Sequence, residues 1–185
     1  MNRRLFILVV SIVIIIIVSS FVYVQVLRRS PLPAAAPGPS AWRGVVPGQT
    51  STSELYQQMG TPVSSLETAA GKTISYSSAN KYWTNDVNIT QDKVTFIKER
   101  VFAPAEISLK KKLVETGKDW IRLYGPDSQY GSFLFAYPAL GIALYADENH
   151  DVVYEVWHFL PTNTSGLLAL PQAQGFSIAL QPRQD

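Results

Sequence analysis

The sequence predicts an α+β protein with an N-terminal transmembrane helix and two tandem units, each a helix followed by a three-stranded antiparallel meander. Three observations lead to this fold class. An apolar run without charge extends from Leu5 to Leu27. Two serine-capped helix signals, at Ser51 and Ser108, stand 57 residues apart. Three runs of strand-like composition follow each of them, with turn residues in between.

The apolar run from Leu5 to Leu27 predicts a single-pass membrane anchor within residues 1–29. Its 23 residues span roughly 34 Å as a helix, which is enough for a hydrocarbon core of about 30 Å. A cleaved signal peptide is the alternative, but the apolar region of such a peptide has only about 7–15 residues. We therefore expect an uncleaved signal anchor that contacts the membrane through this run.

Two arginines flank each end of the run, so the positive-inside rule leaves its orientation nearly undecided. Because long domains translocate largely regardless of charge, we expect a cytoplasmic N-terminus and an extracytoplasmic C-terminal domain. Residues 30–41 contain four prolines, which favour an extended chain. These residues are predicted to form a Pro/Ala-rich linker between the anchor and the domain.

Charge and composition restrict the classes of partner and chemistry. All 14 Asp and Glu residues lie at or after Glu54, whereas four of the 16 Lys and Arg residues flank the apolar run. The chain from Trp42 onward therefore has a net charge of −2, which argues against nucleic acid as a partner. The absence of cysteine excludes disulfides, thiol catalysis and Cys-ligated zinc.

An internal period divides the rest of the chain. Pro47, Pro104 and Pro161 stand 57 residues apart, and a serine follows each of them after four positions. The period predicts a first α+β unit at residues 42–104 and a second at residues 105–185, which includes a C-terminal tail. The length suits two small units that share a core, or one domain.

Local signals predict the elements of each unit. Ser51 and Glu54 form a capping-box pattern, and Gly60 ends the helix. Ser108 caps a helix at residues 109–116, and residues 120–123 are expected to add a further helical turn. The helices are expected to cover one face of the sheet. Strands are expected at residues 73–78, 83–90, 94–102, 133–137, 141–146 and 152–160, with a further short one in the tail at residues 176–180.

The segment V-P-G-Q-T-S-T-S-E-L-Y-Q-Q-M-G-T-P, from Val46 to Pro62, resembles the SmpA/OmlA-like domains of bacterial envelope proteins. Two such units in tandem are also similar to the arrangement of the β-lactamase inhibitory protein. The second unit departs from the motif, with Lys118 and Asp119 in place of Thr61 and Pro62. The resemblance implies an α+β fold in the cell envelope. The outer-membrane lipoproteins of that family need a lipidated cysteine, which this chain lacks.

One acidic segment has part of a metal-binding pattern. Asp147, Asn149 and Asp151 have the 1, 3, 5 spacing of a calcium loop, with His150 among them. Val152 stands where that loop requires glycine, and Asp and Asn also favour turns through their own backbone hydrogen bonds. We therefore expect a solvated hairpin turn and no metal site.

His158 lies between Trp157 and Phe159 and is expected to be a half-buried strand histidine. A general base needs a nucleophile and an orienting partner within reach, and the sequence contains no nucleophile motif such as G-x-S-x-G. We therefore expect no catalytic residue, no cofactor and no enzyme activity. Lys110 to Lys112 are expected on a solvated helix face, with contact to anionic lipid as the alternative.

Aromatic residues give the clearest indication of function. The last strand of the second unit carries large rings on both faces, although helices are expected to cover only one. An uncovered sheet face rich in Trp and Tyr is typical of a protein-binding surface. The expected binding residues are Trp83, Tyr137, Tyr145, Trp157 and Phe159.

The sequence therefore predicts a membrane-anchored protein-binding module of the bacterial cell envelope, with an envelope protein as its partner. Three alternatives stay open. The aromatic face is covered by the tail or by the other sheet. The chain is a structural scaffold. The domain is a small-ligand sensor, whose pocket would gather His158, Tyr137 and carboxylates.

Overall fold

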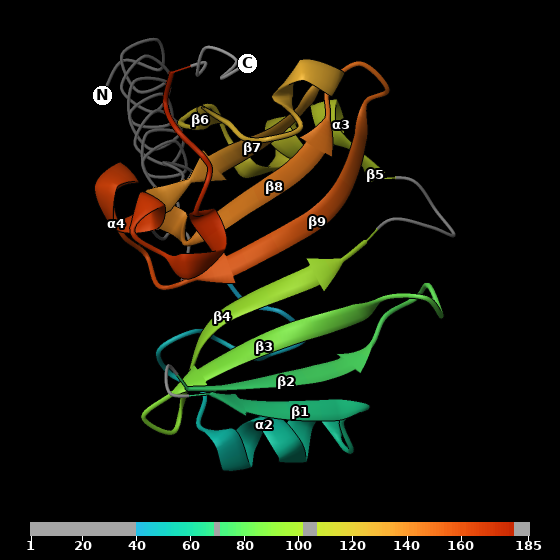
Figure 1. The fold of residues 1–185 in the computed structure, drawn as a ribbon, viewed down its shortest axis with the longest axis vertical. Helices are drawn as coiled ribbons and strands as arrows, with labels where there is room; N and C mark the ends of the chain where they lie inside the picture. The colour runs from blue at the N-terminus through green and yellow to red at the C-terminus, as the bar shows by residue number, and fades with distance from the viewer. Residues whose placement is uncertain (1–39, 69–70, 102–106, 180–185) are drawn as a thin grey trace, which may run out of the picture. The chain divides into compact units, whose positions relative to one another are not determined.

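A nine-stranded antiparallel sheet is the framework of the fold, in a computed structural model that describes residues 40–68, 71–101 and 107–179. The strands lie in the spatial order β1-β2-β3-β4-β9-β8-β7-β6, and the short β5 also pairs with β9 (Figure 1). Their bounds are β1 (Ser64–Thr68), β2 (Gly71–Ser77), β3 (Thr84–Thr90), β4 (Lys93–Arg100), β5 (Ile107–Ser108), β6 (Ile121–Tyr124), β7 (Ser132–Tyr137), β8 (Ile142–Asp147) and β9 (Val152–Phe159).

The described helices are short. Ser51 caps α2 (Thr52–Met59), and the reciprocal bonds of a capping box with Glu54 are present. Ser108 caps α3 (Leu109–Thr116), and Asp151 also accepts a hydrogen bond from the backbone of Lys110 in its first turn. The others are α4 (Thr164–Leu168) and the 3₁₀ turns η1 (Ser128–Tyr130), η2 (Pro138–Leu140) and η3 (Pro171–Ala173).

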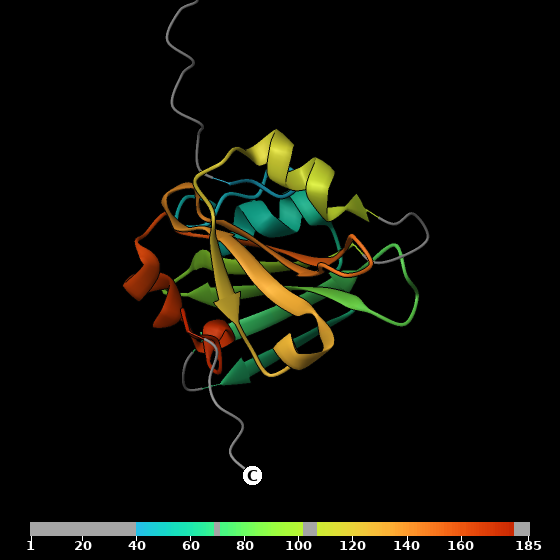
Figure 2. The ribbon, with the colours of Figure 1, turned by 90° about the horizontal axis from the view of Figure 1, so that it is seen from above.

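The pairing of β4 with β9 joins two meanders into one sheet and determines which side chains of the two halves share a face. Ile97 lies opposite His158, and Glu99 lies opposite Val156, so these four side chains point to the same face. Leu55 of α2 packs with Ile97 in one core cluster, and Leu109 of α3 packs with Val156 in another. Both helices therefore cover the same face, as the sequence predicts (Figure 2).

The opposite face is covered in one half only. The C-terminal segment, residues 163–177, packs over β8 and β9 through Leu167, Ala173 and Phe176. Figure 1 shows this segment in front of β8 and β9, whereas no helix lies in front of β2 and β3. On β2 and β3 that face carries short polar side chains that bond to one another. Thr73 bonds to Asn88 and Ser75 to Asp86 across the two strands, and Thr84 bonds to Asp86 within β3.

The predicted fold class is wrong in its architecture. Residues 42–104 and 105–185 do not form separate three-stranded units, because the first half contributes four strands and the second half five strands to one continuous sheet. Strand β1, whose residues are all exposed, was not predicted, and the residues of β6 were predicted to be helical. Ile121 and Leu123 alternate toward one face of the sheet, whereas Trp120 contacts Phe135 on the other. That is a strand period, and over so few residues it was mistaken for a helical one.

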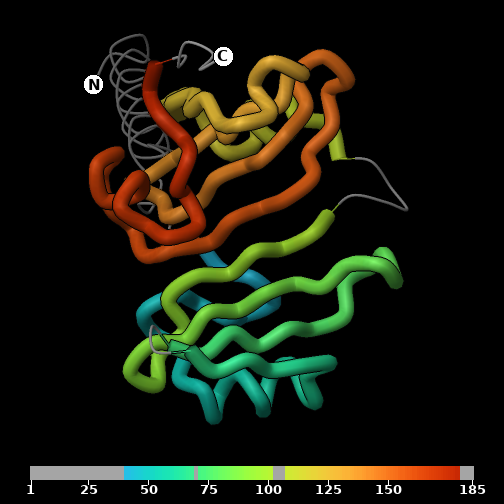
Figure 3. The backbone as a smooth tube through the Cα atoms, viewed as in Figure 1, coloured from blue at the N-terminus to red at the C-terminus, as the bar shows by residue number. Residues whose placement is uncertain are grey.

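Most local predictions are confirmed. The two capped helices and the six predicted strands are present, with ends that shift by one or two residues. Gln91 and Asp92 both have positive φ, as expected for a two-residue hairpin turn. The strand predicted at residues 176–180 is reduced to a single bridge between Ser177 and Tyr124. The path of the chain through both meanders to the tail can be followed in Figure 3.

The membrane-anchor prediction is also corrected. No helix among residues 40–68, 71–101 and 107–179 is long and apolar enough to cross a membrane. The run from Leu5 to Leu27 and most of the linker at residues 30–41 lie outside the described residues. The transmembrane and signal-anchor assignment and the extracytoplasmic localisation are therefore not supported by a membrane-spanning helix among the described residues.

Candidate binding site

Three of the five predicted binding residues belong to the core. Trp157 and Phe159 are 3% and 1% exposed, because the C-terminal segment packs over them. Tyr137 is 2% exposed on the helix side, where its hydroxyl donates to the carbonyl oxygens of Leu113 and Gly117. The open face predicted around these three residues is therefore covered.

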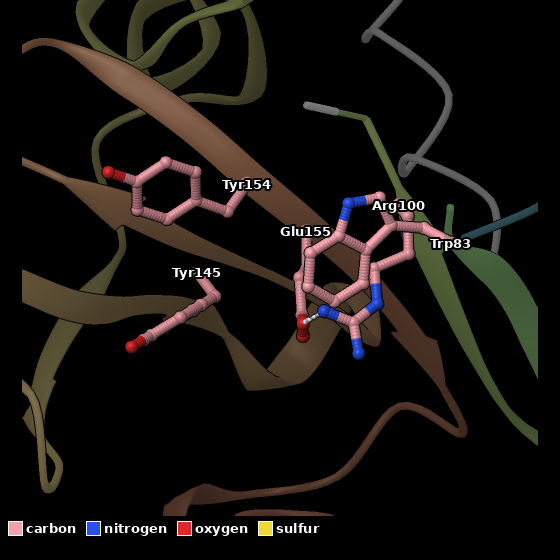
Figure 4. A pocket seen from close by; sticks show the side chains of 5 residues that line it. All are labelled: Trp83, Arg100, Tyr145, Tyr154 and Glu155. Carbon is pink, nitrogen blue, oxygen red and sulfur yellow. Dashed lines mark ion pairs between the residues drawn. The ribbon is translucent and has the colours of Figure 1, made fainter. Parts of the chain in front are cut away.

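The two remaining residues, Trp83 and Tyr145, line the same pocket. Its volume is about 260 Å³, and Arg100, Tyr154 and Glu155 complete the lining (Figure 4). Trp83 is 48% exposed and directly precedes β3, whereas Arg100 ends β4. Tyr145 comes from β8, and Tyr154 and Glu155 come from β9. The pocket therefore exists only because β4 pairs with β9.

A β-bulge brings Tyr154, which was not among the predicted binding residues, to the pocket. Strict alternation along β9 places Tyr154 and Glu155 on opposite faces. In the structure Tyr145 pairs with Glu155 and Ala146 pairs with Val153, which leaves Tyr154 as an extra residue. Its ring then contacts the ring of Tyr145, with 6.1 Å between centroids. No local pattern in the sequence marks this bulge.

An ion-paired cluster forms one wall of the pocket. The Arg100 Nη1 atom lies 2.5 Å from Glu155 Oε1, and Lys98 Nζ lies 3.9 Å from Oε2. The indole N–H of Trp157 donates to the same Oε2 at 2.7 Å. The Glu155 side chain is only 8% exposed, so these partners compensate the cost of burying its charge. On its other side the Arg100 guanidinium stacks on Trp83, 4.8 Å from the ring centroid.

The two tyrosines form the other wall. The Tyr145 hydroxyl donates to Asp127 Oδ2 at 2.6 Å, and the Tyr154 hydroxyl donates to Asp147 Oδ2 at 3.2 Å. Figure 4 shows both hydroxyls turned away from Trp83 and Arg100, so the rings rather than the oxygens border the pocket. Burial and the hydrogen bond to Asp127 raise the pKa of Tyr145 well above its usual range. The Tyr145 ring is therefore a neutral, apolar part of this wall at physiological pH.

The two histidines do not contribute to this pocket. His158 is 5% exposed on the helix side, with Nδ1 2.5 Å from Ser40 Oγ. Its Nε2 lies 3.6 Å from Glu99 Oε2, which is too long for a hydrogen bond. His150 lies in the hairpin turn before β9 and bonds to Asp147. Among the residues that the structure describes, no group of three or more His, Cys, Asp and Glu could hold a metal ion.

In comparisons with known proteins, the chain matches no family model, no curated protein and no solved structure. The resemblance of the segment from Val46 to Pro62 to SmpA/OmlA-like domains therefore stays a prediction.

Proposed function

We propose that this chain is a protein-binding module and not a catalyst, and that the Trp83 pocket receives a side chain of its partner. The observation that carries the proposal is the position of Trp83. Its large ring is about half exposed, yet the Arg100 guanidinium fixes it beside an apolar pocket. Tryptophan, tyrosine and arginine are also the residue types that dominate binding energy in protein interfaces.

The size of the pocket favours a partner's side chain over a small-molecule ligand. A volume of about 260 Å³ lies below the range of roughly 300–1,000 Å³ that is typical of small-molecule sites. The short polar side chains of β2 and β3 continue from the pocket as a partly exposed sheet face. An aromatic anchor beside a polar surface is the usual composition of an interface.

The energy available at Trp83 is sufficient for a binding hot spot. A Trp side chain buries roughly 150–250 Å² when it is covered, and about half of this ring is still accessible. Covering about 100 Å² at 25 cal/mol per Å² contributes about 2–3 kcal/mol. Truncation of Trp83 should therefore weaken binding by about 30-fold or more.

The test starts with a photoreactive benzoylphenylalanine in place of Tyr82, which is 79% exposed and adjacent to Trp83. Irradiation of cells that produce the chain should give one discrete crosslinked protein, which is identified, purified and titrated by calorimetry. Trp83→Ala should weaken its binding by about 30-fold. Tyr130→Ala is the matched control, because Tyr130 is 68% exposed on η1 and does not line the pocket. Equal affinity for the two variants would overturn the proposal.

A further inference from the structure

The two outer strands of the sheet differ in how their free edges are covered. At β6, Tyr124 and Ser177 exchange both backbone hydrogen bonds at 2.8 Å, so the C-terminal segment covers part of that edge. At the other end, β1 pairs only with β2 among the described strands, and all five of its residues are exposed (Figure 1). The open edge of the sheet is therefore at β1.

Strand β1 lacks the features that normally prevent an edge strand from pairing. Such strands are usually protected by lysine, proline, a β-bulge or a covering segment. Ser64–Thr68 contains no lysine and no proline, and its register with β2 runs without a bulge over all five residues. Helix α2 packs on β2, β3 and β4 through Leu55, and it leaves both faces of β1 exposed. The outer backbone groups of β1 are therefore accessible to a further strand.

The side chains of β1 also permit such pairing. Glu67 is the one charged residue of the strand, and Lys72 Nζ of β2 lies 3.3 Å from its Oε1, which weakens its repulsion of a second carboxylate. Leu66 is the one apolar residue of the strand and is 64% exposed. It lies opposite Thr73, on the face that α2 and α3 do not cover. A strand that pairs with β1 would remove part of this side chain from water.

The sequence of β1 is complementary to itself. In an antiparallel pair of two β1 strands centred on Leu66, this residue meets its own copy, Ser65 lies opposite Glu67, and Ser64 lies opposite Thr68. Apolar and hydroxyl pairs of this kind stabilise a sheet, and no like charges are directly opposite each other. A pair centred on Glu67 would bring two carboxylates together, and one centred on Ser65 would place Leu66 opposite a serine. The register centred on Leu66 also pairs all five residues, so it is favoured over its neighbours.

We propose that two copies of this chain associate through β1, in a symmetric antiparallel pair whose two-fold axis passes through Leu66. Each residue contact is then made twice, as a two-fold interface requires. Only five residues of each copy pair, so the association is weak and depends on protein concentration. The proposal is independent of the proposed function, because the Trp83 pocket is lined from β4, β8 and β9 and not from β1.

The absence of cysteine from the chain permits a test by disulfide crosslinking. In Leu66→Cys the two Cβ atoms would lie about 4.5–5.5 Å apart across the axis, which is close to disulfide distance. Mild oxidation of this full-length variant should give a dimer on a non-reducing gel, which a reductant removes. Val114→Cys is the matched control, because Val114 is also apolar and is 83% exposed on α3. Leu66→Cys should crosslink at least about tenfold faster, because pairing raises the effective concentration of its thiol.

Two further variants test the register. Ser64→Cys and Thr68→Cys should each form little dimer alone, because each position lies opposite the other and not opposite its own copy. An equal mixture of the two, with an affinity tag on one of them, should form the mixed dimer about as fast as Leu66→Cys crosslinks. An unchanged circular dichroism spectrum of each variant verifies folding.

Three results would overturn the proposal. The first is an equal crosslinking rate for Leu66→Cys and Val114→Cys. The second is crosslinking of Ser64→Cys alone as fast as the mixture, which would exclude the register centred on Leu66. The third is a disulfide between Leu66→Cys and a different protein in cells, without the dimer, because another strand would then occupy the edge. The photocrosslinking experiment at Tyr82 judges the Trp83 pocket separately in each case.

Discussion

Glu155→Gln should destabilise the fold by about 2–3 kcal/mol, even though the two side chains have the same shape. Removing one partner of a buried ion pair typically costs about 3–5 kcal/mol, because the other charge stays behind without compensation. Here the cations left behind, Lys98 and Arg100, have side chains 26% and 27% exposed, so water and salt screen them and the lower value applies. The Gln side chain still accepts the indole N–H of Trp157, which limits the loss further.

The measurement is urea unfolding followed by tryptophan fluorescence, with Glu148→Gln as control. Glu148 also pairs with an arginine that stacks on aromatic rings, but its side chain is 41% exposed, so its loss should cost less than about 1 kcal/mol. In a double-mutant cycle, Glu155→Gln should cost less in the Arg100→Gln background, with a coupling above about 1 kcal/mol. Equal costs for Glu155→Gln and Glu148→Gln would refute the reasoning that burial makes the difference.

Three further predictions concern the fold around the site. Gly141→Ala should lower the free energy of unfolding in urea by about 2–4 kcal/mol, because φ is +67° and a Cβ would meet a backbone oxygen of β9 at 2.1 Å. Gly60 also has a positive φ, but a Cβ there would meet open space. Gly60→Ala should therefore cost only about 1–2 kcal/mol. Ser51→Ala should cost about 1 kcal/mol at pH 7. Hydrogen bonds from Ser51 hold the pKa of Glu54 below its usual 4.5, so this stabilisation should shrink as the pH falls through the lowered pKa. Phe176→Ala should cost about 2 kcal/mol and red-shift the fluorescence, since its ring covers an indole of β9; an unshifted spectrum would contradict that packing.

Local signals in the sequence predicted the elements whose cause is local. Ser51 and Ser108 cap helices because their hydroxyls accept backbone N–H groups within the same turn, so nothing distant is needed. The alternation of Val87 and Ile89 with polar residues reflects one buried face, and strand β3 has that pattern. Strand β1 lacked this signal because it lies at the edge of the sheet with all five residues exposed.

The binding residues could be predicted only in part, because their exposure depends on contacts between distant segments. Trp157 and Phe159 are residue types that are typical of a binding surface. Whether the C-terminal segment covers them depends on tertiary packing, which the local sequence does not show. Tyr154 changed faces through a bulge that depends on the partner strand β8. Trp83 and Tyr145 were predicted to be binding residues, but nothing local indicated that they border the same pocket.

The pairing of Arg100 with Glu155 connects the register of the sheet to the site. These residues lie directly opposite each other on β4 and β9, as do Lys98 and Trp157. A slip by one residue would turn the side chains of β4 to the wrong face, and a slip by two would place Arg100 opposite Trp157 without its carboxylate. The ion pair therefore favours the register that joins the two meanders, and the same register brings Trp83 from one half toward Tyr145 from the other. Arg100 and Glu155 thus both hold the two halves together and line the pocket. Substitutions at these two residues should change stability and binding together, whereas substitutions at Trp83 should change only binding.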